Sequence, residues 1–305
     1  MSKKLRYFVA LALVVLLLPF TRAFADDKPT VTVTTSFLQD MVTQIAGDAV
    51  NIELIIPAGA DPHVYAPKAN DATKVLEADL VLYHGLHFEG KMVEILEQKG
   101  VAVTKDFDKA DLGEMEEDGV VEIDPHFWFD IPLYKKAVQT ASMSLQEKFP
   151  EHKEDFEKRT ADYLAQLDEL DAWIKEELTK LNDDQRFLVT PHDAFNYFAK
   201  AYNFTVYAPQ GISTDSEVSN QGIKETAEFI VEHKIPAIFA ESTTNPERMT
   251  KLQEAAKSLG FDVKVVHGED QELFSDSLAP EGESGDTFID MYKHNINLII
   301  TNLTQ

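Results

Sequence analysis

Three histidines of this chain each follow a proline, in the pairs Pro62-His63, Pro125-His126 and Pro191-His192. Proline fixes its own φ and favours an extended conformation in the residue before it, so each pair presents an imidazole rigidly near the end of an extended segment. Neutral imidazoles bind zinc, manganese and other first-row transition metals. One such pair alone would favour a structural role. Because three of the nine histidines share this context, the sequence predicts a metal site.

A carboxylate would reduce the net charge of a divalent ion in such a site. In the second half of the chain, Glu241 ends an apolar segment and Asp276 ends the segment 272–276, and the residue pattern does not choose between them. Three further acids, Asp61, Asp124 and Asp193, adjoin the histidine pairs, where they would either orient the rings or cap the loops. The remaining histidines lie in contexts typical of structural or surface positions: His84, His87, His152, His233, His267 and His294.

One long segment, Pro150 to Leu181, separates two halves with similar patterns. Its apolar residues recur with helical spacing, and no glycine or proline interrupts it after Pro150, so we expect one long amphipathic helix. Strand-like segments alternate with helix-like ones on both sides of it. They are 31–35, 51–56, 80–83 and 101–104 before it, and 187–190, 204–207, 237–240 and 263–266 after it.

This alternation predicts an α/β fold with two lobes, each a mainly parallel four-stranded sheet flanked by helices. The expected boundaries are 26–149 for the N-terminal lobe, 150–182 for a linking helix that acts as a rigid strut, and 183–305 for the C-terminal lobe. Ligand sites in open α/β sheets lie beyond the carboxyl ends of the strands. We therefore expect the histidines to meet between the two lobes.

The first residues have the pattern of a secretory signal peptide. Lys3, Lys4 and Arg6 precede the apolar run 8–20, and Ala23-Phe24-Ala25 supplies small residues for cleavage after Ala25. The predicted domain 1–25 is therefore removed on export. The chain contains no cysteine, so we expect no disulfide and no lipid anchor at the cleavage site. These features favour a free periplasmic protein.

The chain is strongly acidic. Because residues 1–25 carry four positive charges and no acid, their removal takes the formal net charge from −25 to −29. Such a surface repels nucleic acid and anionic lipid and attracts cations. Nine of the acids fall in the segment 106–124, which we interpret as an acidic surface loop.

Several motifs follow one another along nearly the whole mature chain: Asp61–Tyr65, Leu82–Leu86, Asp124–Trp128, Thr190–Phe195, Gln210–Thr214, Phe239–Ser242, Leu273–Asp276 and His294–Ile296. Together they resemble the motifs of the metal-binding receptors of manganese and zinc ABC transporters, the cluster A-I solute-binding proteins. The resemblance implies two α/β lobes joined by one rigid helix, with the metal between them. It also implies a membrane permease as partner, a monomeric receptor, and no enzymatic activity.

Carried over by this resemblance, the metal ligands are His63 and His126 from the first lobe and His192 and Asp276 from the second. Glu241 is then a supporting residue. Many manganese-selective relatives have Glu where this chain has His192, whereas dedicated zinc receptors usually carry a histidine-rich acidic loop, and the segment 106–124 has no histidine. We therefore favour manganese, followed by zinc and then ferrous iron.

Two other classes of protein use similar residues. A zinc hydrolase has three protein ligands, an open position for water and a nearby base. His-Glu-x-x-His is absent from this chain, and four protein ligands would close the site. A structural or adhesive surface protein would hold the metal without exchanging it.

Overall fold

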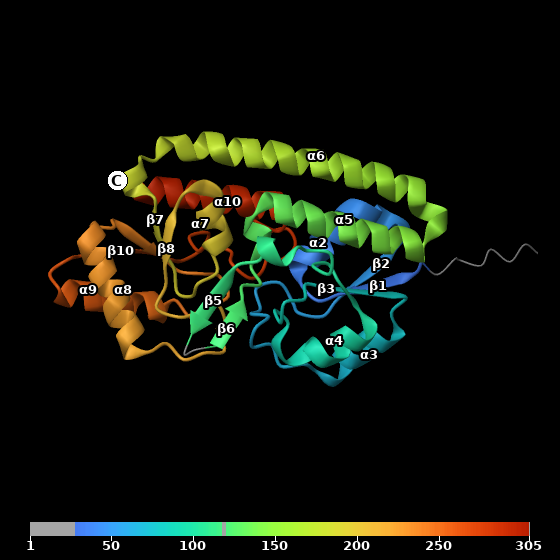
Figure 1. Ribbon diagram of the computed structural model, residues 1–305, viewed down its shortest axis with the longest axis horizontal. Helices are drawn as coiled ribbons and strands as arrows, with labels where there is room; N and C mark the ends of the chain where they lie inside the picture. The colour runs from blue at the N-terminus through green and yellow to red at the C-terminus, as the bar shows by residue number, and fades with distance from the viewer. Residues whose placement is uncertain (1–27, 118–119, 305) are drawn as a thin grey trace, which may run out of the picture.

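A long helical segment joins two α/β halves of the chain in the computed structural model, which describes residues 28–117 and 120–304 (Figure 1). The expected signal peptide, with its cleavage after Ala25, lies outside the described residues. None of the described helices is both long and apolar enough to cross a membrane.

The N-terminal half contains one four-stranded parallel sheet with the strand order β2-β1-β3-β4. Its strands are β1 (Thr30–Val33), β2 (Asn51–Leu54), β3 (Leu80–Tyr83) and β4 (Val101–Ala102). Its helices are α2 (Ser36–Ala46), α3 (Ala69–Glu77), α4 (Val93–Lys99) and α5 (Ile131–Lys148). Side chains fix where two of these helices begin, because Thr35 caps α2 and Asp130 caps α5 by accepting backbone N–H bonds.

The C-terminal half contains the four strands expected there, paired two by two. The strands are β7 (Phe187–Val189), β8 (Thr205–Tyr207), β9 (Ala237–Phe239) and β10 (Lys264–Val266). Parallel ladders join β7 to β8 and β9 to β10, and β7 contacts β9. The helices are α7 (Asn196–Tyr202), α8 (Asn220–His233), α9 (Glu247–Ser258) and α10 (Phe288–Leu303). These eight strands are parallel and flanked by helices, as the sequence predicts. The single four-stranded sheet expected in the C-terminal half is instead present as two two-stranded ladders.

The predicted long helix is present as α6 (Lys153–Glu177), extended by 3₁₀ turns at Pro150–His152 and Leu178–Lys180. Its buried stripe contains Phe156, Tyr163, Leu167, Leu170 and Ile174. In Figure 1, α6 runs along one side of the molecule, over α5 and α10. It also packs against α2, so one apolar stripe contacts helices of both halves. Further 3₁₀ turns are Gly47–Ala49, Gly90–Met92, Lys109–Asp111, Phe127–Phe129 and Asp183–Gln185.

The segment 106–124 differs from the expected acidic loop. It includes an antiparallel hairpin of β5 (Glu114–Glu117) and β6 (Val120–Ile123), in which Met115 pairs with Glu122. Val121 and Ile123 are β-branched and favour extended pairing, although their side chains are exposed. The sequence did not indicate these two short strands, because the many acids around them are typical of a solvated loop.

Candidate metal centre

Four side chains from separate loops converge between the two halves. His63 follows β2, His126 follows β6, and His192 lies just beyond β7. Asp276 follows Leu273, which forms a parallel bridge with Glu241 beyond the end of β9. The structure places one potential ligand atom of each of the four residues within 4.8 Å of the others. These are the four residues that the resemblance to metal receptors implied.

The cluster is compact and almost fully shielded from solvent. The Nε2 atoms of His63 and His126 are 3.3 Å apart. The two carboxylate oxygens of Asp276 each lie 3.3 Å from an imidazole Nε2, Oδ1 from that of His126 and Oδ2 from that of His192. His63 is 7% exposed and the other three side chains are fully buried. Among the described residues, neither Asp276 oxygen has a hydrogen-bond partner of good geometry. Buried polar atoms normally have partners, so this carboxylate suits a cation at the centre of the cluster.

Carboxylates orient two of the three imidazoles. Nδ1 of His126 lies 2.7 Å from Asp124 Oδ1, and Nδ1 of His192 lies 2.5 Å from Glu241 Oε2. Because an ionised carboxylate only accepts hydrogen bonds, Nδ1–H is the donor in both pairs. Each ring therefore directs an unprotonated Nε2 towards the cluster when the imidazole is neutral, the usual arrangement of histidines that bind metal.

The acids beside the histidines have different roles. Asp124 orients the ring of His126, which is one of the two roles expected from the sequence. Asp61 instead holds its loop, because its carboxylate accepts hydrogen bonds from the His63 backbone N–H at 3.0 Å and the Thr214 hydroxyl at 2.6 Å. Asp193 is largely buried, and its Oδ1 has no hydrogen-bond partner among the residues that the structure describes. The sequence alone left these alternatives open.

Burial and charge set the protonation of the cluster. Burial lowers the pKa of His63 to about 3, so this ring is neutral. Burial also opposes protonation of His126, but the charge and hydrogen bond of Asp124 and the charge of Asp276 outweigh burial and raise the pKa of His126 to about 9. The same balance, with Glu241 and Asp276, holds the pKa of His192 well above its usual value. Burial would raise the pKa of Asp276, but the neighbouring imidazoles hold it well below its ordinary range. Without a bound ion, the imidazoles of His126 and His192 therefore favour the protonated form.

The remaining histidines lie outside this group of four. His84 is nevertheless buried nearby, where its Nε2 lies 2.7 Å from the Thr35 hydroxyl and its ring packs edge-on against Trp128. Burial lowers the pKa of His84 to about 3, which is the behaviour of a neutral core histidine.

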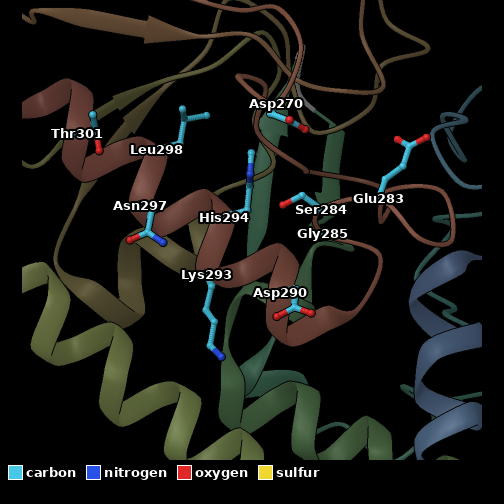
Figure 2. A pocket seen from close by; sticks show the side chains of 10 residues that line it. All are labelled: Asp270, Glu283, Ser284, Gly285, Asp290, Lys293, His294, Asn297, Leu298 and Thr301. Atoms are coloured by element: carbon cyan, nitrogen blue, oxygen red, sulfur yellow. The ribbon is translucent and has the colours of Figure 1, made fainter.

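A cleft of about 370 Å³ reaches the cluster at His63. Its other walls include His87, Glu122 and Ile212, so the hairpin β5–β6 and loops of both halves surround the side of the site nearest to solvent. A separate hollow of about 510 Å³ lies along α10 and contains none of the four clustered residues (Figure 2).

Several buried residues support these loops although the sequence indicated no role for them, among them Trp128, Tyr292 and Asn295. Two of them lie in segments that resemble the metal receptors, Asp124–Trp128 and His294–Ile296. Each of these side chains contacts a residue that is distant in the sequence, so residue spacing alone does not predict these contacts.

Comparison with known proteins agrees with this architecture. Residues 31–302 match the profile of the ZnuA family, described as zinc-uptake complex component A, periplasmic. The chain is 38% identical over 297 residues to the zinc-binding protein TroA of Treponema pallidum, with 94% of each chain covered. It is 35% identical over 280 residues to the manganese-binding lipoprotein MntA of Bacillus subtilis, with 90% of each chain covered. A different chain, also named TroA, has a solved structure and is 63% identical in sequence to this protein. It superimposes with a TM-score of 0.90, and the alignment covers 90% of this chain and 99% of the other.

The chain therefore belongs to the ZnuA family, and the predicted resemblance to cluster A-I metal receptors is confirmed. Other members at about 30% identity are described as substrate-binding lipoproteins of metal or manganese ABC transporters. This is a family of transport receptors rather than enzymes.

Proposed function

We propose that this protein captures a divalent transition metal between its two halves, bound by His63, His126, His192 and Asp276, and delivers it to an ABC permease. The observation that supports this function most is the buried cluster itself, with four ligand atoms within 4.8 Å. Imidazole and carboxylate groups are ordinary ligands for such ions. The acidic surface would raise the local concentration of cations around the protein.

The closed form of the cluster argues against a hydrolase. A catalytic zinc site keeps one coordination position for water or substrate. Here four residues each place a potential donor atom within 4.8 Å of the others, and the most exposed of these residues, His63, is only 7% accessible. The cleft beside His63 offers a route for the ion. Such a route favours exchange, which a purely structural or adhesive metal site would not need.

We infer that manganese is the transported ion. Both oxygens of Asp276 face imidazole nitrogens and lack hydrogen-bond partners in the described part of the chain, so this carboxylate is free to bind through both oxygens. Three imidazoles and two oxygens would give five donor atoms, more than the four typical of structural zinc sites. Carboxylate oxygens are ligands that manganese prefers, whereas softer ions prefer nitrogen or sulfur ligands.

Zinc is the second candidate, because the three imidazoles and one carboxylate oxygen also make a four-donor set that zinc accepts. Zinc generally binds a given site more tightly than manganese, and the relative TroA is described as zinc-binding. Ferrous iron is the third candidate.

We place the working protein in the periplasm, as a monomer that begins after Ala25. In this proposal, the lobes are residues 26–149 and 183–305, and the segment 150–182 links them. Because α6 packs along helices of both halves, we expect only small tilts of the lobes when the ion leaves.

Competitive titration of the metal-stripped mature protein with Mn²⁺ and Zn²⁺ tests the proposal. We expect one tightly bound ion per chain, lost in His192→Ala and retained in His267→Ala, which removes an exposed histidine from a loop. Binding that is indifferent to His192 would overturn the assignment. Elemental analysis of protein isolated from cells supplied with both metals then identifies the ion, and zinc in place of manganese would select the second candidate.

A further inference from the structure

Helix α10 touches the loops that carry two of the four clustered residues, one from each half of the chain. Tyr292 and Asn295 lie three residues apart on α10 and therefore share one face of the helix. Both side chains are buried, with 1% and 2% of their surface exposed. Their polar groups are directed to backbone atoms of the two loops.

Tyr292 holds the loop of His126. Its hydroxyl donates a hydrogen bond of 2.7 Å to the backbone oxygen of Phe129. The backbone N–H of Phe129 in turn donates to the carbonyl oxygen of His126, at 3.3 Å. The 3₁₀ turn Phe127–Phe129 thus connects the hydroxyl of Tyr292 to the backbone of His126 through two hydrogen bonds.

Asn295 holds the loop of Asp276 more directly. Its Oδ1 accepts from the backbone N–H of Phe274 at 3.0 Å, and its Nδ2 donates to the backbone oxygen of the same residue at 2.8 Å. Phe274 is two residues before Asp276. The preceding residue on the helix, His294, donates from Nε2 to the Glu272 backbone oxygen at 2.9 Å. Figure 2 shows His294 on α10, pointing into the hollow along this helix.

A third contact joins the two loops without the helix. Trp128 Nε1–H, two residues after His126, donates to the backbone oxygen of Ser275 at 2.9 Å. The segment Glu272–Asp276 contains only one bridge residue and no helix. These side chains therefore replace the regular hydrogen bonds that would otherwise fix the position of Asp276.

We propose that Tyr292 and Asn295 are positioning residues. They hold the loops of His126 and Asp276 against the same helix, α10, and so set the distance between His126 and Asp276 before the ion binds. The inference rests on the proposed metal-binding function and adds to it. A loop that is already ordered loses less conformational freedom when its carboxylate binds an ion, so affinity rises without any new contact to the metal.

The test uses the metal-stripped mature protein and Co²⁺, whose visible absorption reports the geometry of its ligands. The variants are Asn295→Ala, which removes both bonds to Phe274, and Tyr292→Phe, which removes only the hydroxyl. The matched controls are Asn302→Ala, a buried asparagine on the same helix that bonds to Leu298 and Lys264, and Tyr163→Phe, a buried tyrosine that bonds to Tyr134. Dissociation constants come from competition with a chelator, and thermal unfolding is recorded without metal.

We expect Asn295→Ala to bind Co²⁺ about 10- to 100-fold more weakly, in the range found for residues that support metal ligands, with an altered absorption spectrum. Tyr292→Phe should change the spectrum in the same direction with a smaller loss of affinity. The two controls should keep the wild-type spectrum and affinity, even where they lower the melting temperature.

Unchanged spectra and affinities in both variants, with only a lower melting temperature, would overturn the inference and leave a purely structural role. If Asn295→Ala fails to fold, the result for Tyr292→Phe decides, because that change deletes a single oxygen. A failure of the proposed function is distinguishable, since the wild-type protein would then bind no Co²⁺, or His126→Ala would bind it as well as wild type.

Discussion

Binding of the ion should expel protons from the cluster, because two imidazoles are protonated without it. Nitrogen must be unprotonated to coordinate a metal. The carboxylates around His126 raise its pKa to about 9, and those around His192 hold its pKa well above the usual value. His63, with a pKa lowered to about 3 by burial, is already neutral and gives up no proton.

The number of protons follows from these pKa values. At pH 7.5, a group with a pKa of about 9 is about 97% protonated, whereas an ordinary histidine near 6.5 is about 9% protonated. His126 should thus release nearly one proton and His192 up to one more. Because each released proton changes the affinity about tenfold per pH unit, the association constant should rise about 10- to 100-fold per unit as pH increases from 6.5 to 8.5. Lower pH favours the protonated imidazoles and so weakens binding.

Isothermal titration calorimetry with Zn²⁺ at pH 7.5, in two buffers of different ionisation enthalpy, counts the protons. We expect between one and two per ion for the wild-type chain. In Glu241→Gln, the charge that favours protonation of His192 is lost while an acceptor for its Nδ1–H remains, so the count should decrease by up to one. The reasoning would be refuted by release of less than half a proton in the wild type, or by a count that Glu241→Gln leaves unchanged.

Three further results are expected. Burial raises the pKa of Glu89 to about 7, so its contribution to stability is full below its unfolded pKa of about 4.5 and is lost as pH rises through 7. In urea unfolding of the metal-free protein, the unfolding free energy should decrease from pH 5 to pH 8, and Glu89→Gln should make this decrease smaller by about 2.5 kcal/mol; an unchanged decrease would contradict this. Zn²⁺ at 1,000 times its dissociation constant should stabilise the wild type by about 4 kcal/mol and raise its melting temperature, an effect absent from His63→Ala. Asp124→Asn should weaken metal binding about 10- to 100-fold, because it removes the charge beside His126; equal affinity in a chelator competition would argue against that role.

The architecture was accessible from the sequence because its signals are local. Helical spacing from Pro150 to Leu181 predicted the segment that contains α6, and β-branched runs between amphipathic segments predicted the parallel strands. For the C-terminal half, the sequence predicted one four-stranded sheet, whereas the structure has the separate ladders β7–β8 and β9–β10, because strand pairing depends on tertiary contacts that local patterns do not show. The hairpin β5–β6 was missed because nine acids in 106–124 suggested a solvated loop.

The candidate site was only partly accessible. The repeated Pro-His pairs identified the three histidines that the structure brings together, because each pair is a local signal. The choice of Asp276 over Glu241 came from the resemblance to metal receptors. In the structure, Asp276 belongs to the cluster and contacts His126 and His192, whereas Glu241 contacts the far ring nitrogen of His192, Nδ1. No local pattern distinguishes these two positions, because they depend on how Leu273 pairs beyond the end of β9.

The central claim, that one ion is held between the halves by His63, His126, His192 and Asp276, is tested most directly by anomalous X-ray diffraction. Crystals of the mature protein loaded with Mn²⁺ or Zn²⁺ would be measured on both sides of the absorption edge of the metal. The account predicts one strong anomalous peak per chain, about 2.0–2.2 Å from the three Nε2 atoms and from the Asp276 carboxylate for zinc. A peak elsewhere on the molecule, or none within reach of these four side chains, would contradict it.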